Sequence, residues 1–157
     1  MSKKHQKLTQ YLKEKLDLLN LNKENFESSM EKMVVENSGV YFSDNSQVLC
    51  KTKTDCVYWF ENINGKYLPL LTALISAWLY YNDFCNNSDD NAQISMDITE
   101  LEDISKEKYM DLEITLTFVD EITLQENESG PIELDGIKYD EGTAEIYVAE
   151  AGTVNGA

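Results

Sequence analysis

Residues 55–83 read DCVYWFENINGKYLPLLTALISAWLYYND and predict a strand, a turn and a helix in direct succession. The run from Cys56 to Phe60 is apolar and favours β structure, and the asparagines and glycine of residues 62–65 tolerate turn geometry. Pro69 then stands where the first turn of a helix accepts proline. The helix carries two neighbouring apolar stripes at spacings of three and four, Leu68, Leu71, Ile75, Trp78 and Leu70, Leu74, Ala77, Tyr81. Such a helix is expected to be covered on most of its sides.

The residues before this stretch predict two helices and then strands. Apolar residues at helical spacing predict an amphipathic helix near the amino terminus, namely Leu8, Tyr11, Leu12, Leu16 and Leu19. Asn22 is a candidate cap for a second, short helix whose apolar residues are Phe26, Met30, Met33 and Val34. Between residues 40 and 60, β-favouring residues predict two or three strands, interrupted by the turn-prone residues 43–46.

The residues after it predict further strands. Ile94, Met96 and Ile98 alternate with polar residues, as do Leu112, Ile114, Leu116 and Phe118, which predicts an antiparallel pair with one buried face. Asp135-Gly136 between residues 132–134 and 137–139 predicts a hairpin. Residues 145–149 are a candidate last strand, and residues 152–157 a loose end.

Together these elements predict an α+β fold, in which a mostly antiparallel or mixed sheet packs against a buried central helix and the amphipathic amino-terminal helix. We expect residues 1–126 to form this domain and residues 127–157 to form a C-terminal β-hairpin extension with a loose end. The longest apolar run is shorter than the ~20 residues that span a bilayer, and no apolar segment follows basic residues at the start. Neither secretion nor membrane insertion is therefore expected.

The formal net charge is −16, and the acidic residues are concentrated in the later part of the chain. Up to Lys53 there are nine lysines and seven acidic residues, whereas from Thr54 onward there are four lysines and 22 acidic residues. Such a chain repels nucleic-acid phosphate. It also contains no arginine, the residue best suited to clamp phosphate or carboxylate groups, which disfavours phosphate-handling enzymes.

No arrangement of residues predicts catalysis, a metal site or a cofactor. The cysteines Cys50, Cys56 and Cys85 lack metal-ligand spacing and are expected to be reduced, partly buried thiols. His5, the only histidine, lies among lysines and is expected to be solvated. Asp97, Glu100, Glu102 and Asp103 lack the ordered frame of a calcium loop. We predict that the protein is not an enzyme.

Candidate contact residues come from charge and from aromatic side chains. Lys3, Lys4, Lys7 and Lys13 are candidates for contacts with other subunits or partners, although a solvated end is the simpler interpretation of the first three. Trp59 is a candidate interface anchor, but its place in an apolar run favours the core. For Trp78 the core is favoured more strongly.

The order of these features resembles the tail completion protein R (GpR-like) family of temperate bacteriophages with contractile tails. The amphipathic first helix leads to Leu21-Asn22-Lys23-Glu24-Asn25-Phe26, and residues 59–66 stand at a loop of that family. Pro69-Leu70-Leu71, Ala77-Trp78-Leu79 and Asn82-Asp83 match its helix and the end of that helix. Met96-Asp97-Ile98 and residues 112–117 match its later strands, so the resemblance runs from about Leu8 to Leu124.

The resemblance implies a structural protein that caps the head-proximal end of the tail and enables head-tail joining. It implies a homo-oligomeric ring, with a hexamer favoured, that contacts tail tube, sheath and head-tail connector proteins while DNA passes through without specific binding. We expect assembly in the host bacterial cytoplasm and a final place in the virion tail or neck. In such a ring Asp97, Glu100, Glu102 and Asp103 are candidates for an acidic lumen, because a negative wall does not trap phosphate.

Two other classes of function stay open at this point. An acidic DNA-mimic protein would inhibit a nucleic-acid-binding partner by presenting carboxylates at phosphate-like spacing. A cryptic hydrolase is the other alternative, and no catalytic motif in the sequence supports it.

Overall fold

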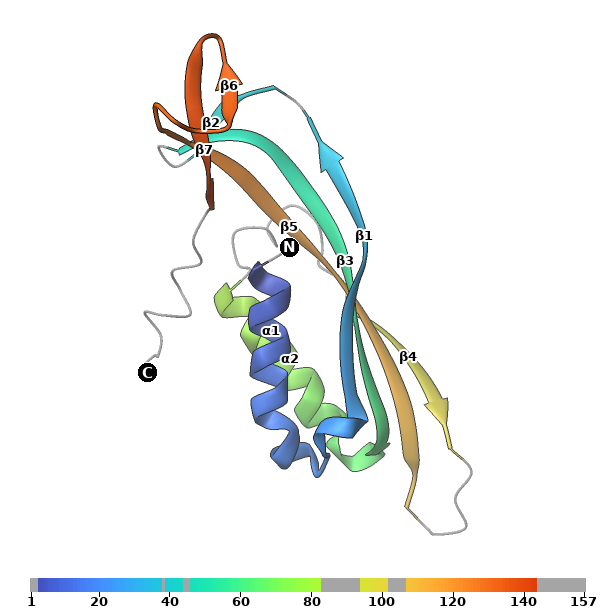
Figure 1. Ribbon diagram of the computed structural model, residues 1–157. Coiled ribbons are helices and arrows are strands. Elements are labelled where there is room, and N and C mark those ends of the chain that lie inside the picture. The colour runs from blue at the N-terminus through green and yellow to red at the C-terminus, as the bar shows by residue number, and fades with distance from the viewer. Residues whose placement is uncertain (1–2, 38, 44–45, 83–93, 102–106, 144–157) are drawn as a thin grey trace.

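One antiparallel sheet forms the framework of the protein, and two α-helices lie side by side on one of its faces (Figure 1). The structure is a computed structural model that describes residues 3–37, 39–43, 46–82, 94–101 and 107–143. Its helices are α1 (Lys3–Lys15) and α2 (Leu68–Asn82). Its strands are β1 (Phe26–Glu36), β2 (Tyr41–Ser43), β3 (Ser46–Asn64), β4 (Ser95–Glu100), β5 (Tyr109–Glu126), β6 (Ile132–Leu134) and β7 (Ile137–Thr143).

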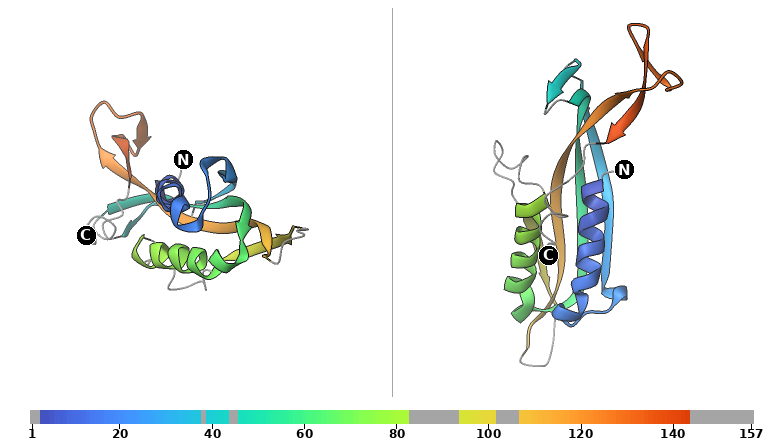
Figure 2. Two further views of the ribbon diagram at one scale, coloured as in Figure 1. Left: turned by 90° about the horizontal axis from the view of Figure 1, so that it is seen from below. Right: turned by 90° about the vertical axis from the view of Figure 1, so that its left-hand side faces the viewer.

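Two long strands, β3 and β5, run through the middle of the sheet with 19 and 18 residues. The order of strands is β1-β3-β5-β7-β6, while β2 extends the edge beside β1, and β4 pairs with the lower half of β5. Bulges interrupt β1 between Met30 and Lys32, and β3 near residues 49 and 61–62. Bulges increase the local twist, and this sheet curls like half of a barrel (Figure 2).

The core lies between the helices and the concave face of the sheet. From the sheet, Tyr58, Phe60, Ile114 and Phe118 are fully buried there. The predicted amphipathic helix is confirmed by α1, whose Leu8 and Leu12 are fully buried. From α2, Leu71, Ile75 and Trp78 are buried, and the Trp78 ring meets that of Phe118 edge-on at 6.1 Å between centroids. The core position predicted for Trp78 is confirmed.

The fold-class expectation of a sheet packed against a buried central helix is wrong. The sheet forms one layer along the whole length of the molecule, and α2 lies with α1 on one face of it with one stripe buried (Figures 1 and 2). Its second apolar stripe is open, since Leu70 is 39% and Tyr81 52% exposed. A single sheet covers only the face of the helix that lies on it. A helix with apolar residues on all its sides can therefore be buried on one side only.

The short helix predicted after Asn22 is also wrong. Asn22 and Asn25 do form a reciprocal capping box, but the helix that they cap is a 3-10 helix of three residues, Lys23–Asn25. The chain then enters β1, where Phe26, Ser28 and Met30 lie opposite Phe60, Tyr58 and Cys56 of β3. A spacing of four between Phe26 and Met30 fits one face of a strand as well as one face of a helix.

The predicted antiparallel pairing of the later strands is confirmed, but the buried face expected on both of them is present only on β5, since Ile98 of β4 is 50% exposed. β4 pairs antiparallel with β5, with Met96 opposite Ile114. β6 and β7 form the predicted hairpin, and Asp135 and Gly136 take the left-handed φ values of 51° and 79° that its two-residue turn requires. The candidate strand at residues 145–149 and the end at 152–157 lie outside the described residues, and the division of the chain after residue 126 stays a prediction.

Candidate functional site

The candidate contact lysines all lie on α1 but differ in their surroundings. Lys3 and Lys13 are exposed, and Lys7 is half-buried. Lys4, in contrast, is buried, and its Nζ donates a hydrogen bond of 2.8 Å to the backbone oxygen of Val119 on β5. Lys4 therefore anchors α1 to the sheet, and the exposed lysines are the ones that another molecule can reach.

His5 is buried, so the expectation of a solvated side chain is wrong. Its Nδ1 lies 2.8 Å from the hydroxyl oxygen of Tyr58 on β3. One turn further along α1, Thr9 Oγ1 lies 2.9 Å from Ser28 Oγ on β1. Burial lowers the pKa of His5 and raises the pKa of Tyr58, because both charged forms lose hydration. These groups tie α1 to two strands, and the neutral forms suit that structural role.

The two described cysteines are buried and free. Burial, together with the carboxylates of Asp120 and Asp55 that repel a thiolate, raises the pKa of Cys56 to about 12. A thiol of this kind is a poor nucleophile. The described residues also hold no cluster of three or more metal-ligating side chains.

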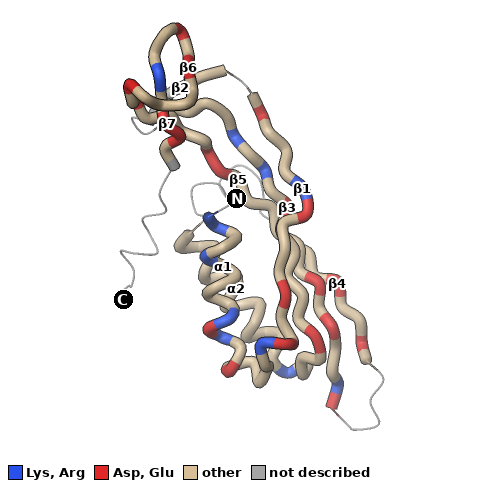
Figure 3. Tube along the Cα trace, in the orientation of Figure 1, with Lys and Arg blue, Asp and Glu red and all other residues tan. Residues whose placement is uncertain are grey.

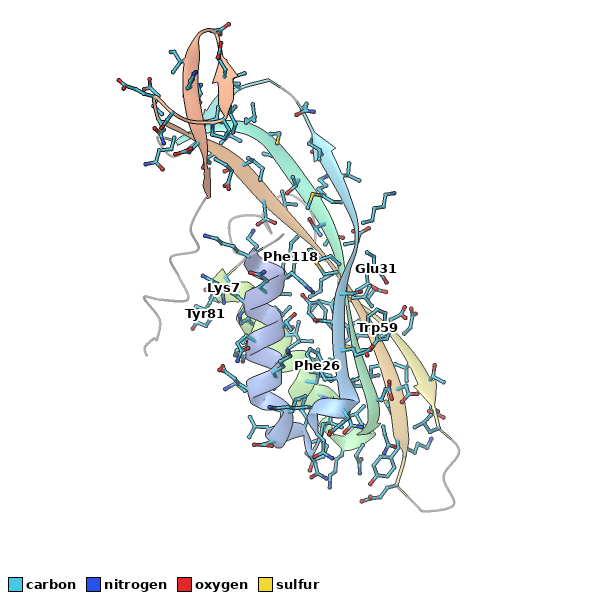
Figure 4. The ribbon with its side chains drawn as sticks, in the orientation of Figure 1. Lys7, Phe26, Glu31, Trp59, Tyr81 and Phe118 are labelled. Atoms are coloured by element: carbon cyan, nitrogen blue, oxygen red, sulfur yellow. The ribbon has the colours of Figure 1, made fainter. Side chains whose placement is uncertain are left out.

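Trp59 lies on the face of the sheet that points away from the helices (Figure 4). The side chain is half-buried, and its Nε1 donates a hydrogen bond of 2.9 Å to Glu113 Oε1 on β5. The prediction that Trp59 belongs to the core is wrong, because residues next to each other in a strand point to opposite faces and its neighbours Tyr58 and Phe60 occupy the buried one.

Trp59 belongs to a row of four residues that crosses this outer face. In the register of the sheet Glu27 is opposite Trp59, Trp59 is opposite Glu113, and Glu113 is opposite Asp97. The row therefore carries three carboxylates around one indole, and Glu113 and Asp97 are like charges directly opposite each other. Like charges opposite each other destabilise a sheet. Residues that lower stability in this way are typical of functional surfaces.

We call the lower outer face of the sheet the acidic face and define it by Glu27, Glu61, Asp97, Asp111 and Glu113. Acidic residues gather there on β3, β4 and β5 (Figure 3). The upper outer face is mixed in charge, since Lys53 Nζ lies 3.3 Å from Glu36 Oε1 and Lys32 is opposite Asp55. The outer face of the sheet is therefore acidic at its lower end and mixed in charge at its upper end.

The residues predicted to form an acidic lumen are divided by the structure. Asp97 is part of the acidic face. Glu100 ends β4 on the other face of that strand, where its Oε1 lies 3.9 Å from Lys108 Nζ. Glu102 and Asp103 lie outside the described residues. Sequence reasoning missed Glu27, because the sequence predicted a helix in the part of the chain that forms β1.

The open stripe of α2 is a second surface that sequence reasoning missed. It consists of Leu70, Ala73, Leu74, Ala77 and Tyr81, all exposed except Leu74, which is half-buried. No residue of α2 is charged. Tyr80 and Tyr81 lie in the last turn of α2, and their rings meet edge-on with the centroids 5.2 Å apart. An apolar stripe along a whole helix is typical of a surface that binds another protein.

The model of the P2 phage tail completion protein R (GpR) family matches residues 2–143 of this chain. The chain belongs to this family. Tail completion protein R is a structural protein of phage tails, so a role in phage tail assembly follows for the chain.

Two further comparisons stand beside the GpR match. A 19.2 kDa uncharacterized protein of Haemophilus phage HP1 (strain HP1c1), from its rep-hol intergenic region, is 28% identical over 128 residues, which cover 80% of this chain and 75% of that protein. No solved structure matches the chain at a significant level. None of the helices in the described part of this GpR-family protein is long and apolar enough to span a membrane.

Proposed function

We propose that this protein completes the phage tail as a ring at its head-proximal end, where it joins tail and head. The ring is homo-oligomeric, and a hexamer matches the sixfold symmetry implied for contractile tails. Its partners are the tail tube and sheath proteins on one side and the head-tail connector on the other. It assembles in the cytoplasm of the host bacterium and ends in the neck of the virion.

The observation that carries this proposal is the acidic face. DNA that leaves the head must pass the centre of such a ring, and carboxylates repel its phosphates. The row through Trp59 places Glu113 directly opposite Asp97 on two adjacent strands at a cost in stability, which a lumen would explain. Lys3 and Lys13 lie on α1, on the opposite side of the sheet, and so face away from this lumen.

A phage from which the gene is deleted tests the role directly. We expect its lysates to contain heads and tails that are not joined, and we expect the wild-type gene supplied in trans to restore infectious particles. Particles that assemble and infect normally without the gene would overturn the proposal. A reconstruction of the neck then tests the lumen, which should be lined by the acidic face and not by Lys3, Lys7 or Lys13.

The same acidic face favours one second candidate, an acidic DNA mimic that inhibits a nucleic-acid-binding partner. Its carboxylates on adjacent strands present regularly spaced negative charge, as a phosphate backbone does. This candidate predicts that duplex DNA competes with the protein for a DNA-binding protein of the host or phage. It also predicts that deletion of the gene leaves tails complete and joined.

A further inference from the structure

The open stripe of α2 and one edge of the sheet lie on opposite flanks of the molecule. α2 packs beside β5 through Trp78 and Phe118, and α1 packs over β1 through Thr9 and Ser28. One flank is therefore formed by α2 and β4, and the other by α1 and β1 (Figure 2). Figure 4 shows Tyr81 at the upper end of α2, on the side of the helical layer that is turned away from the sheet.

The β1 flank also exposes apolar side chains. Met33, Val34 and Val35 are consecutive, and each is about half exposed, with Val34 at 45% and Val35 at 51%. Met33 and Val35 lie on the face of β1 that carries the helices, because Met33 is opposite Thr54, which is opposite the buried Phe118. Consecutive apolar residues on an edge strand are a hazard for aggregation unless another chain covers them.

The two apolar surfaces lie at the same height along the strands. Met33, Thr54 and Phe118 form one row across the sheet, and Trp78 of α2 meets Phe118 of that row. Tyr81 follows Trp78 by about one helical turn, ~5 Å, which is less than two residues along a strand. The end of the α2 stripe therefore stands level with Met33 and Val35, on the other flank.

Opposite charges also stand level on the two flanks. α1 descends from Lys4 at Val119 to Thr9 at Ser28, so Lys13 lies one further turn down, beside the row of Phe26, Phe60, Leu112 and Ile98. On the other flank Ile98 is exposed, and Glu100 lies two residues further along the same face of β4. If a second copy is related to the first by a rotation about an axis parallel to the strands, its β1 flank meets the α2 flank of the first copy. The apolar surfaces and the opposite charges then come into contact together.

We propose that a second copy of this chain covers the α2 stripe, with its β1 edge at Met33 and Val35 against Tyr81 and its Lys13 against Glu100. The contact rests on the ring proposed above and specifies how its subunits meet. Because the two surfaces differ, the contact is head-to-tail and repeats around a closed ring. It leaves the acidic face uncovered, facing the axis.

Cross-linking between two variants that each carry one added cysteine tests the contact. Tyr81→Cys and Val35→Cys are made in the full chain with Cys85→Ser, mixed at high concentration and treated with a short bismaleimide. We expect a cross-linked dimer from the mixture and its loss when either variant is treated alone. The double variant Tyr81→Cys, Val35→Cys should give a ladder of oligomers. The parent chain, with Cys50 and Cys56 only, shows the background.

Val34→Cys is the matched control for Val35→Cys. The two valines are adjacent and similarly exposed, but they point to opposite faces of β1. A mixture of Tyr81→Cys with Val34→Cys should therefore lose the cross-linked dimer. Equal yields from Val34 and Val35 would overturn the assignment of this face.

The same variants are then expressed in cells that produce phage, because assembly can require the tail as a template. A dimer from Tyr81→Cys alone would show that two α2 helices meet in a symmetric contact. A cross-link of Tyr81→Cys only to a tail tube or sheath protein would show that this protein, and not a second copy, covers the α2 stripe. Either result overturns the contact. If no variant cross-links while the deleted phage is still rescued by the wild-type gene, the proposed contact fails and the role in tail completion stands.

Discussion

The Nδ1 atom of His5 lies 2.8 Å from the hydroxyl oxygen of Tyr58, across 53 positions of the chain. The two rings are tilted by 49° with their centroids 5.3 Å apart. Both side chains are buried, so this contact holds the start of α1 on the sheet beside the hydrogen bond from Lys4 to Val119. The only histidine of the chain thus stabilises the fold.

The stability of the protein should therefore depend on pH through His5. Burial lowers its pKa below the 6.5 of the unfolded chain, so just below pH 6.5 the unfolded chain binds more protons. The free energy of unfolding then falls as the pH falls through this window, by at most about 1.4 kcal/mol per pH unit.

His5→Gln should remove this dependence, since glutamine has no proton to gain. Urea unfolding of both proteins between about pH 5 and 7.5 measures it, and the difference between the two curves isolates His5 from the many carboxylates. A difference that stays constant over this range would show that His5 titrates alike in the folded and unfolded chains.

The two stripes of α2 should respond differently to truncation. Trp78→Ala removes a buried ring that packs on Phe118 and should lower the free energy of unfolding by about 3–5 kcal/mol. Tyr81→Ala removes an exposed ring and should change it by about 0.5 kcal/mol or less. Urea unfolding of the purified monomer measures both. A Trp78→Ala variant as stable as wild type would contradict the core position.

The elements of the fold could be predicted from sequence where the signal was local. The Asp135-Gly136 turn is specified by two residues with positive φ, and α1 and α2 by apolar spacing. β1 could not be predicted in this way, because the bulge after Met30 shifts its alternation and leaves apolar residues three and four apart, as in a helix.

The surfaces depended on contacts between distant parts of the chain. The sequence showed that acidic residues follow Thr54, but only the register between β1, β3, β5 and β4 brings Glu27 into line with Glu113 and Asp97. Likewise, the apolar residues of α2 indicated burial, whereas the single sheet covers one stripe and leaves the other open. Local patterns predicted the elements, and the pairing of strands decided which residues meet.

Gly136 should be needed for the hairpin of β6 and β7 alone. Its φ of 79° is costly for any residue with a Cβ atom, although the space around it is open. We expect Gly136→Ala to destabilise the hairpin by about 1 kcal/mol. Hydrogen exchange should accelerate about fivefold at residues 132–139 and remain unchanged in the middle of β3. Glu133→Ala in the same hairpin is the control and should leave the exchange rates unchanged. Faster exchange in β3 of the Gly136→Ala variant would show that the hairpin supports the whole sheet.

Reversing one charge of the acidic face should stabilise the protein and impair the phage. Asp97→Lys replaces a like-charge pair with Glu113 by an opposite-charge pair and should raise the free energy of unfolding by about 0.2–1 kcal/mol. The gain should shrink near 1 M salt, where the Debye length is about 3 Å. Glu133→Lys is the mirror control, since Glu133 is opposite Lys138 and the change creates a like-charge pair.

The test of function uses the same two variants in phage. If the acidic face lines the path of DNA, a lysine at position 97 attracts phosphate, and we expect fewer infectious particles per assembled virion with Asp97→Lys. Glu133→Lys lies on the hairpin and should leave that ratio unchanged. Asp97→Lys particles that are joined normally and infect as well as wild type would show that the acidic face does not meet DNA.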